Sequence, residues 1–354
     1  MAQATDTDTA ALHALCAQLL GRRVTAVDCL EGGRNSQVYQ VTCGDEGRYV
    51  AKRYIRYRPD GQDSMDIEWA TLQFLWEHGL RCVPKPVAVD RTQRCAIYEY
   101  VDGTSVEMET VTEADLDAAI HFLADLKVLA GHERSATFPP ASEACFSPAA
   151  IEANLQARLE RLAALPDEEG PFHALHAFLA QGFRPALASV VGWCRARLQP
   201  SGGAWTSELP AHRRTLSPSD FGFHNAIRRA DGTLVFLDFE HFGWDDPAKM
   251  IADVLLHPAM PLAQAIRRSF TSKILSRFDA EAGLADRLAL VYPLFGLKWC
   301  LILLNEFVPQ ELARRARATQ DGMRVPELQF LQLSKSKRML QRVMEDYERF
   351  PYRH

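Results

Sequence analysis

Residues 217–225 have the sequence SPSDFGFHN, and residues 234–240 have the sequence LVFLDFE. An aspartate followed five residues later by an asparagine, and then an apolar strand that ends in aspartate, is typical of a kinase catalytic loop and its metal-binding strand. Phosphoryl transfer needs a carboxylate that orients the attacking hydroxyl and accepts its proton, and it needs oxygen ligands for magnesium. We therefore assign the first role to Asp220 and the second to Asn225 and Asp238.

Taken alone, the D-x-x-x-x-N spacing is common, and it also fits a capped loop. The continuation favours the functional interpretation. Asp231-Gly232 lies between the two segments and is typical of a tight hairpin turn. Such a turn would fold Asp238 back beside Asn225.

The first hundred residues predict a small antiparallel sheet. Their β-rich runs are separated by turns that are too short for the crossover that parallel pairing requires. A helix at 10–20 precedes strands at 24–30, 36–43 and 48–54, and a helix at 64–78 is followed by strands at 87–89 and 95–100.

The rest of the chain is predicted to be mostly helical. Helical apolar spacing marks 113–130 and 151–165, a compact β-like region covers 215–238, and helices continue from Lys249. The fold class is thus α+β with two lobes, namely a nucleotide-binding lobe at 1–101 and a larger helical lobe at 102–354 that carries the catalytic loop and an acceptor pocket. The oily stretch 288–307 contains a proline and three polar or charged residues, so we expect a buried helix there rather than a membrane span.

A lysine and a glutamate of the N-terminal lobe have the spacing of a phosphate-binding pair. Lys52 ends the run Tyr-Val-Ala-Lys on the third predicted strand, where an ammonium group could pair with nucleotide phosphates. Glu68, on the following helix, could anchor it. The competing interpretation is an edge-strand lysine that points at water.

Two further segments of this lobe are candidates for nucleotide contact. The glycine-rich turn before the second strand contributes Gly33, Asn35 and Ser36, because glycines let backbone N–H groups approach phosphates. The end of the last strand offers adenine the carbonyl of Glu99 and the N–H of Val101. An ordinary hairpin turn and an ordinary linker are the alternatives.

Together these signals occur in one order: glycine loop, strand lysine, helix glutamate, hinge, Asp…Asn and Asp. In that order they resemble the aminoglycoside phosphotransferase and choline kinase-like family, over about residues 24–257. The resemblance implies a protein-kinase-like fold, with ATP and Mg²⁺ as cofactors. It implies that Asp220 is the base, that Asn225 and Asp238 hold magnesium, and that Glu240 touches a second ion.

The chain departs from the family pattern at two places. Pro218 stands where the family usually has a histidine, two residues before the catalytic aspartate. Lys249-Met250 stands near the position of a usual aspartate, for which Asp253 could substitute. Both positions brace the loop in the family, so the departures concern its packing.

Composition limits the partners. The formal net charge of −5 among 354 residues argues against a nucleic-acid surface, and the polar start of the chain does not resemble a secretory signal. Eight scattered cysteines fit reduced thiols, so we expect a cytoplasmic protein without a membrane partner. The sequence leaves the oligomeric state open.

The expected acceptor is a hydroxyl of a small molecule, such as a sugar, an amino-sugar or an amino-alcohol. Too few residues separate Asp238 from the Asp-Pro-Ala segment at 246–248 for the activation loop of a protein kinase. The acidic residues near the site, Glu240, Asp245 and Asp246, favour a cationic acceptor. The basic residues Arg228, Arg229 and Lys298 favour a carboxylate-bearing sugar instead. Trp299 and Glu306 could reach the pocket or simply belong to a core helix. A catalytically silent nucleotide- or partner-binding module, motivated by Pro218, is the alternative function.

Overall fold

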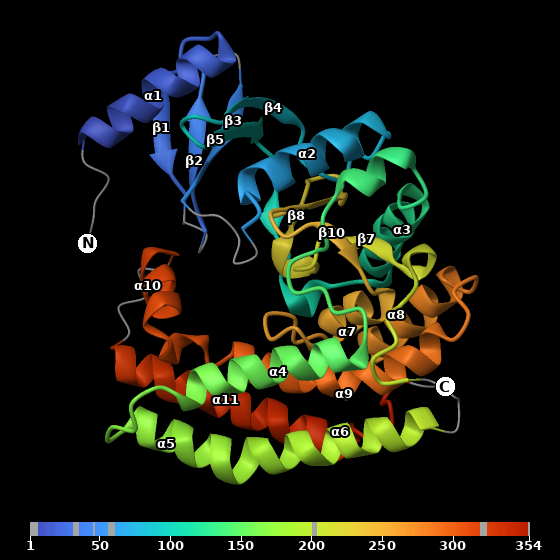
Figure 1. The fold of residues 1–354 in the computed structure, drawn as a ribbon. Helices are drawn as coiled ribbons and strands as arrows, with labels where there is room; N and C mark the ends of the chain where they lie inside the picture. The colour runs from blue at the N-terminus through green and yellow to red at the C-terminus, as the bar shows by residue number, and fades with distance from the viewer. Residues whose placement is uncertain are drawn as a thin grey trace. The chain divides into compact units, whose positions relative to one another are not determined.

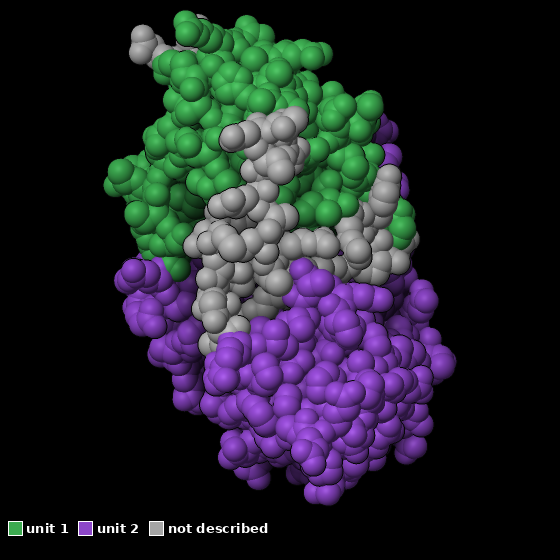
Figure 2. Space-filling view, turned by 90° about the vertical axis from the view of Figure 1, so that its left-hand side faces the viewer, with its two compact units in different colours: residues 1–106, 225–242, 314–320 green, residues 107–224, 243–313, 321–354 purple. Residues whose placement is uncertain are grey.

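The computed structural model describes residues 6–30, 35–44, 47–55, 61–199, 204–318 and 324–352. The chain forms two compact units, shown in Figure 2: unit 1 contains residues 1–106, 225–242 and 314–320, and unit 2 contains the remainder. The hairpin 225–242 therefore belongs with the N-terminal sheet. The proposed lobe boundary at 101/102 stays a prediction.

Unit 1 is built on a five-stranded antiparallel sheet with the order β1-β2-β3-β5-β4. The strands are β1 (Ala26–Cys29), β2 (Ser36–Thr42), β3 (Arg48–Tyr54), β4 (Pro86–Asp90) and β5 (Cys95–Glu99), and the helices are α1 (Asp6–Leu20) and α2 (Ser64–Glu77). The predicted antiparallel sheet with an inserted helix is confirmed. Because β3 is the middle strand, the edge-strand interpretation of its lysine is wrong.

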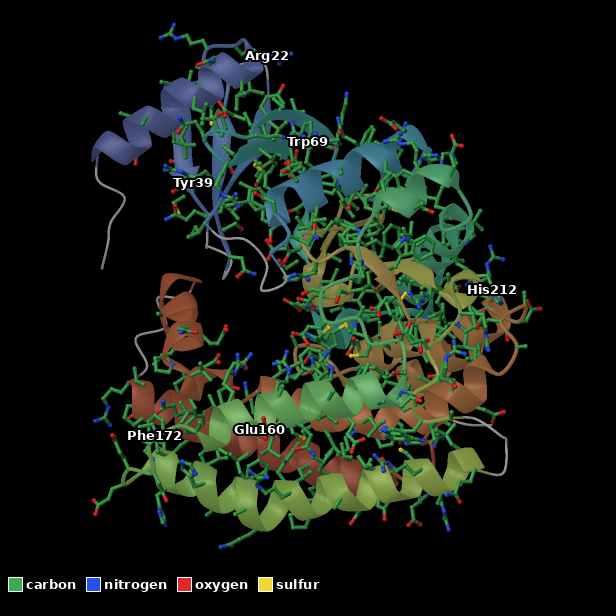
Figure 3. The ribbon with its side chains drawn as sticks, in the orientation of Figure 1. Arg22, Tyr39, Trp69, Glu160, Phe172 and His212 are labelled. Carbon is green, nitrogen blue, oxygen red and sulfur yellow. The ribbon has the colours of Figure 1, made fainter. Side chains whose placement is uncertain are left out.

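The two helices of unit 1 cover opposite faces of this sheet. Successive side chains of a strand point to opposite faces. Ala51 of β3 is fully buried in a cluster with Leu12 and Cys16 of α1, whereas its neighbour Lys52 contacts Glu68 of α2. Figure 1 shows α1 alongside the sheet, and Figure 3 labels Trp69 on α2, whose ring lies 6.2 Å from that of Tyr98 on β5.

A second, three-stranded sheet in unit 1 has the order β6-β8-β9. Its strands are β6 (Thr104–Ser105), β8 (Ala226–Arg228) and β9 (Leu234–Phe236). The predicted turn between β8 and β9 is confirmed: Gly232 has φ +87°, and Asp231 Oδ1 accepts hydrogen bonds from the N–H and the hydroxyl of Thr233. A bond from Leu237 N–H to the Asn225 carbonyl, 2.8 Å long, extends this ladder toward Asp238.

Unit 2 is mostly helical. Its helices are α3 (Glu113–Leu129), α4 (Pro148–Ala163), α5 (Pro171–Phe178), α6 (Arg184–Leu198), α7 (Pro247–Leu256), α8 (Gln264–Arg277), α9 (Leu284–Ile302), α10 (Pro309–Ala318), which runs on into residues assigned to unit 1, and α11 (Val325–Asp346). Helix α9 is central, since α4, α6, α7 and α11 all contact it. Figure 1 shows α4, α9 and α11 alongside one another.

Helix α9 contains most of the oily stretch noted in the sequence. Residues 284–307 are long and apolar enough to cross a membrane by length and composition, and 78% of their most apolar window is buried inside the structure. Burial to this extent is typical of a core helix, which is what the sequence predicted for this stretch. A short π-helical segment, Leu179–Phe183, joins α5 to α6.

Two short strands in unit 2 flank the catalytic-loop sequence. They are β7 (Thr215–Ser217) and β10 (Gly243–Asp245), and they pair antiparallel. The sequence did not predict β10. A Cβ atom on Gly243 would lie 2.3 Å from the carbonyl oxygen of Pro139, so this close approach of two backbones requires glycine.

Candidate active site

In unit 1, Lys52 lies at the centre of an acidic cluster. Its Nζ is 2.7 Å from Glu68 Oε2, 2.8 Å from Asp238 Oδ1 and 3.5 Å from Glu240 Oε2. The lysine comes from β3, the first carboxylate from α2, and the other two from the segment that follows β9. The structure therefore brings together four of the residues that the sequence singled out.

The charges of this cluster do not balance. Burial by itself would lower the pKa of Lys52, but the three carboxylates outweigh burial and hold that pKa well above its usual range. The ammonium group therefore stays charged. Burial and the neighbouring negative charges raise the pKa of Glu68 despite its contact with the lysine.

A buried carboxylate oxygen that accepts no hydrogen bond from the described residues makes the cluster fit a divalent cation. Glu240 is 4% exposed, and within the described part of the chain no donor forms a hydrogen bond to its Oε2. Oxygen atoms of Glu68, Asp238 and Glu240 lie within 4.8 Å of one another. Hard oxygen donors with surplus negative charge are what Mg²⁺ prefers.

The backbone at Asp238 is unusual. Its φ is +65°, a left-handed conformation that aspartate adopts more readily than most residues. The left-handed residue lies two positions after the last residue of β9, and its carboxylate reaches Lys52. Asn35 also joins the cluster, because its Nδ2 donates to Glu240 Oε1 over 2.7 Å.

The remaining nucleotide-site candidates are more dispersed. Ser36 is buried at the start of β2, and Val101 is buried just after β5. The Glu99 carboxylate accepts from Arg229 and from the Lys85 N–H. Gly33 lies outside the described residues. These contacts leave the proposed adenine and phosphate roles as predictions.

In unit 2, the loop that carries Asp220 is held by serines. Ser219 has φ +68°, its N–H donates to Ser217 Oγ, and its hydroxyl donates to the Ser142 carbonyl over 2.7 Å. These contacts fasten the residue immediately before Asp220. The loop thus has side-chain anchors on both sides of Pro218, where the family usually has a histidine.

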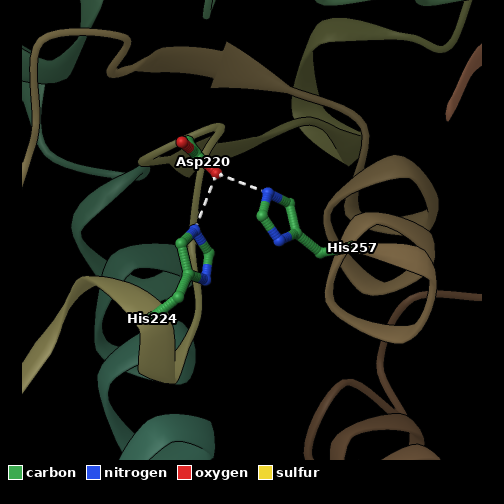
Figure 4. Close-up of side chains that lie close together, drawn as sticks. All are labelled: Asp220, His224 and His257. Atoms are coloured by element: carbon green, nitrogen blue, oxygen red, sulfur yellow. Dashed lines mark hydrogen bonds and ion pairs between the residues drawn. The ribbon is translucent and has the colours of Figure 1, made fainter. Parts of the chain in front are cut away.

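Two histidines contact the candidate base (Figure 4). His224 Nε2 lies 3.1 Å and His257 Nε2 lies 3.3 Å from Asp220 Oδ1. Burial would raise the pKa of Asp220, but hydrogen bonds donated by both imidazoles outweigh burial and hold the pKa well below its usual range. Asp220 is therefore a carboxylate at neutral pH, as a proton acceptor must be.

Sequence reasoning did not assign either histidine a role. The spacing of His224, four residues after Asp220, was the one local signal. His257 ends α7 and comes close only through tertiary packing.

Several residues proposed for acceptor binding are engaged in buried ion pairs instead. Asp245 is fully buried against Lys249, and Asp246 is buried against Arg287. Lys298 is 3% exposed and lies 3.2 Å from Glu143. Because these charges are neutralised internally, the sequence-based suggestion that they select the acceptor is wrong.

The position that departs from the family pattern forms its own ion network. Lys249 Nζ lies 2.7 Å from Asp245 Oδ2 and 3.0 Å from Asp253 Oδ2. Burial by itself would lower the pKa of Lys249, but the two carboxylates raise it. Asp253 is thus a structural partner of this lysine.

We expect Lys249→Met to lower the free energy of unfolding by about 3–5 kcal/mol, because it leaves a buried carboxylate without its counter-charge. Urea denaturation followed by circular dichroism measures this change. Lys273→Met is the matched control, since Lys273 pairs with Glu113 and Asp117 at the surface. The control substitution should leave the urea concentration at the unfolding midpoint almost unchanged. Equal shifts of this midpoint in both variants would contradict the buried network.

A unit built on an antiparallel sheet with a buried lysine among carboxylates, and a largely helical unit with Asp220 in a serine-anchored loop, define the class of kinase-like phosphotransferases. The model of the phosphotransferase enzyme family matches residues 29–290, most of the chain. The protein belongs to this family, and it is a phosphotransferase that acts on the hydroxyl of a small molecule.

Solved structures share the fold at low sequence identity. A spectinomycin phosphotransferase, APH(9)-Ia, in complex with ADP and spectinomycin, has a TM-score of 0.63 at 11% identity, covering 91% of this chain and 98% of that one. Choline kinase LicA from Streptococcus pneumoniae has a TM-score of 0.57 at 16% identity over 94% and 98%. The ADP-bound aminoglycoside phosphotransferase APH(2'')-Ib has a TM-score of 0.57 at 16% identity, covering 96% of this chain and 99% of that one. No curated protein sequence matches this chain.

Proposed function

We propose that this enzyme transfers the γ-phosphoryl group of ATP, with Mg²⁺, to a hydroxyl of a sugar, an amino-sugar or an amino-alcohol in the cytoplasm. The observation that carries the proposal is the cluster in which one buried ammonium faces three carboxylates, one of which has a buried oxygen that accepts no hydrogen bond within the part of the chain that the structure describes. ADP in two of the similar structures supports the choice of nucleotide. The acceptor class is supported by the spectinomycin bound in the first of these structures. It is also supported by a further similar structure, which is named as a choline kinase.

In this proposal the residues divide the chemistry among them. Lys52, held by Glu68, binds the nucleotide phosphates. Asp238, Asn225 and Glu240 hold magnesium, which supplies positive charge against the phosphates when it is bound. Asp220 accepts the proton of the acceptor hydroxyl.

The silent-module alternative rested on Pro218. The Ser219 hydroxyl bond to Ser142 gives the loop another support at this place, so a loss of activity does not follow from the missing histidine. Family membership also favours an active enzyme.

A screen of hydroxyl acceptors that reads ADP release from MgATP tests the proposal. We expect release above the rate with water for at least one amino-sugar, sugar or amino-alcohol. Comparison of ATP with GTP in the same assay identifies the nucleotide. Silence across the panel, together with thermal stabilisation by MgATP, would instead indicate the nucleotide-binding module.

A further inference from the structure

The contacts of His257 determine which of its nitrogens carries the proton. The N–H of Ala259 points at His257 Nδ1 over 3.2 Å, so Nδ1 accepts a hydrogen bond and has no proton of its own. In neutral imidazole the proton is then on Nε2. That nitrogen lies 3.3 Å from Asp220 Oδ1, so His257 donates to the carboxylate.

The ring of His257 is fixed on two sides. It stacks on His224 with ring centroids 4.0 Å apart and an interplanar angle of 10°, and it meets Trp299 edge-on at 4.6 Å. The side chain of His257 is only 14% exposed. Packing from both sides leaves the imidazole little room to rotate away from Asp220.

Trp299 is in turn held by the buried ion network. Its indole N–H donates to Asp253 Oδ1 over 3.0 Å, and the other oxygen of Asp253 pairs with Lys249. A continuous series of contacts therefore runs from Lys249 through Asp253, Trp299 and His257 to Asp220. All five residues belong to unit 2.

We propose that His257 is a positioning residue, which holds the Asp220 carboxylate in one orientation by donating its Nε2–H to Oδ1. This inference rests on the proposed function, in which Asp220 accepts the proton of the acceptor hydroxyl. Small displacements of a catalytic group can cost about 10²-fold in rate. Asp220, His224 and His257 also lie close enough together to hold a metal ion. A metal ion would need a lone pair on His257 Nε2, however, and the contact with Ala259 places the proton on that nitrogen.

Two substitutions at one site separate positioning from packing. His257→Gln keeps an amide N–H that can reach Asp220, but it loses the ring. His257→Phe keeps the ring between its two neighbours, but it loses the donor. We expect His257→Phe to lower kcat about 10- to 100-fold with an unchanged KM for MgATP, and His257→Gln to stay within about threefold of the wild type.

The rates are measured as ADP formation from MgATP, with water as the acceptor until a faster acceptor is found. His173→Phe, an exposed histidine on α5, is the control and should leave the rate unchanged. If His257→Phe is the more active of the two variants, the side chain acts through packing and the proposal is overturned. Equal rates in the wild type and Asp220→Asn would overturn the proposed function itself.

A second measurement examines the hydrogen bond without turnover. Long-range ¹H–¹⁵N spectra of the full chain should show His257 protonated at Nε2 and unprotonated at Nδ1. Protonation at Nδ1 would overturn the proposal. So would stoichiometric binding of Zn²⁺ by calorimetry that His257→Gln abolishes, because the cluster would then be a metal site.

Discussion

Asp220→Asn will lower kcat by about 10²- to 10⁴-fold and leave the affinity for MgATP unchanged, because the amide cannot accept the proton of the acceptor hydroxyl. The substitution keeps the size of the side chain. Asp220 belongs to unit 2, whereas the lysine cluster belongs to unit 1, so the nucleotide-binding groups remain intact. Steady-state kinetics with MgATP and calorimetry of MgATP binding measure the two effects separately.

Asp117→Asn serves as the control for this experiment. Asp117 is an exposed carboxylate on α3 of the same unit, and it pairs with Lys273 at the surface. We expect wild-type kinetics from this variant. A matching fall in MgATP affinity in Asp220→Asn would show that Asp220 binds the nucleotide and does not serve as the base.

Asp238→Asn should abolish turnover and weaken MgATP binding by more than about 10²-fold, because it removes a proposed magnesium ligand. Asparagine tolerates the left-handed backbone at this position, so the local fold should survive. The variant also relieves the surplus negative charge around Lys52. The melting temperature without nucleotide should therefore stay the same or rise.

Asp28→Asn, on an exposed position of β1 in unit 1, is the matched control for nucleotide binding. Calorimetry with MgATP should give the wild-type affinity for this variant. Normal MgATP affinity in Asp238→Asn would refute the magnesium assignment, and a large fall in its melting temperature would show that the carboxylate is mainly structural.

Patterns in the local sequence predicted the secondary structure, because each strand and turn depends mainly on residues that are neighbours in the chain. The period-two runs and short turns predicted the five strands of the main sheet, and β3 begins and ends at the predicted residues. Lys52 and Glu68 could be paired in advance because a strand lysine with a glutamate 16 residues later on the following helix is part of the kinase-like order of signals. Their expected contact is confirmed at 2.7 Å.

Contacts made by tertiary packing could not be predicted. His257 is far from Asp220 in the sequence, and its position follows from where α7 ends. Asp245 and Asp246 could be considered for acceptor binding because their buried partners are not evident from the sequence. For Asp245 alone, the four-residue spacing to Lys249 was available as a helical signal. The functional roles assigned to Asp220, Asn225 and Asp238 stay predictions.

The core position of α9 has a consequence for biosynthesis. Three of its neighbours, α4, α6 and α7, are synthesised before it, but α11 follows it in the chain. Until α11 leaves the ribosome, one side of a segment as oily as a membrane span stays uncovered. Nascent chains of this enzyme are therefore candidates for chaperone capture, and truncations that end before Val325 should aggregate where the full chain remains in solution.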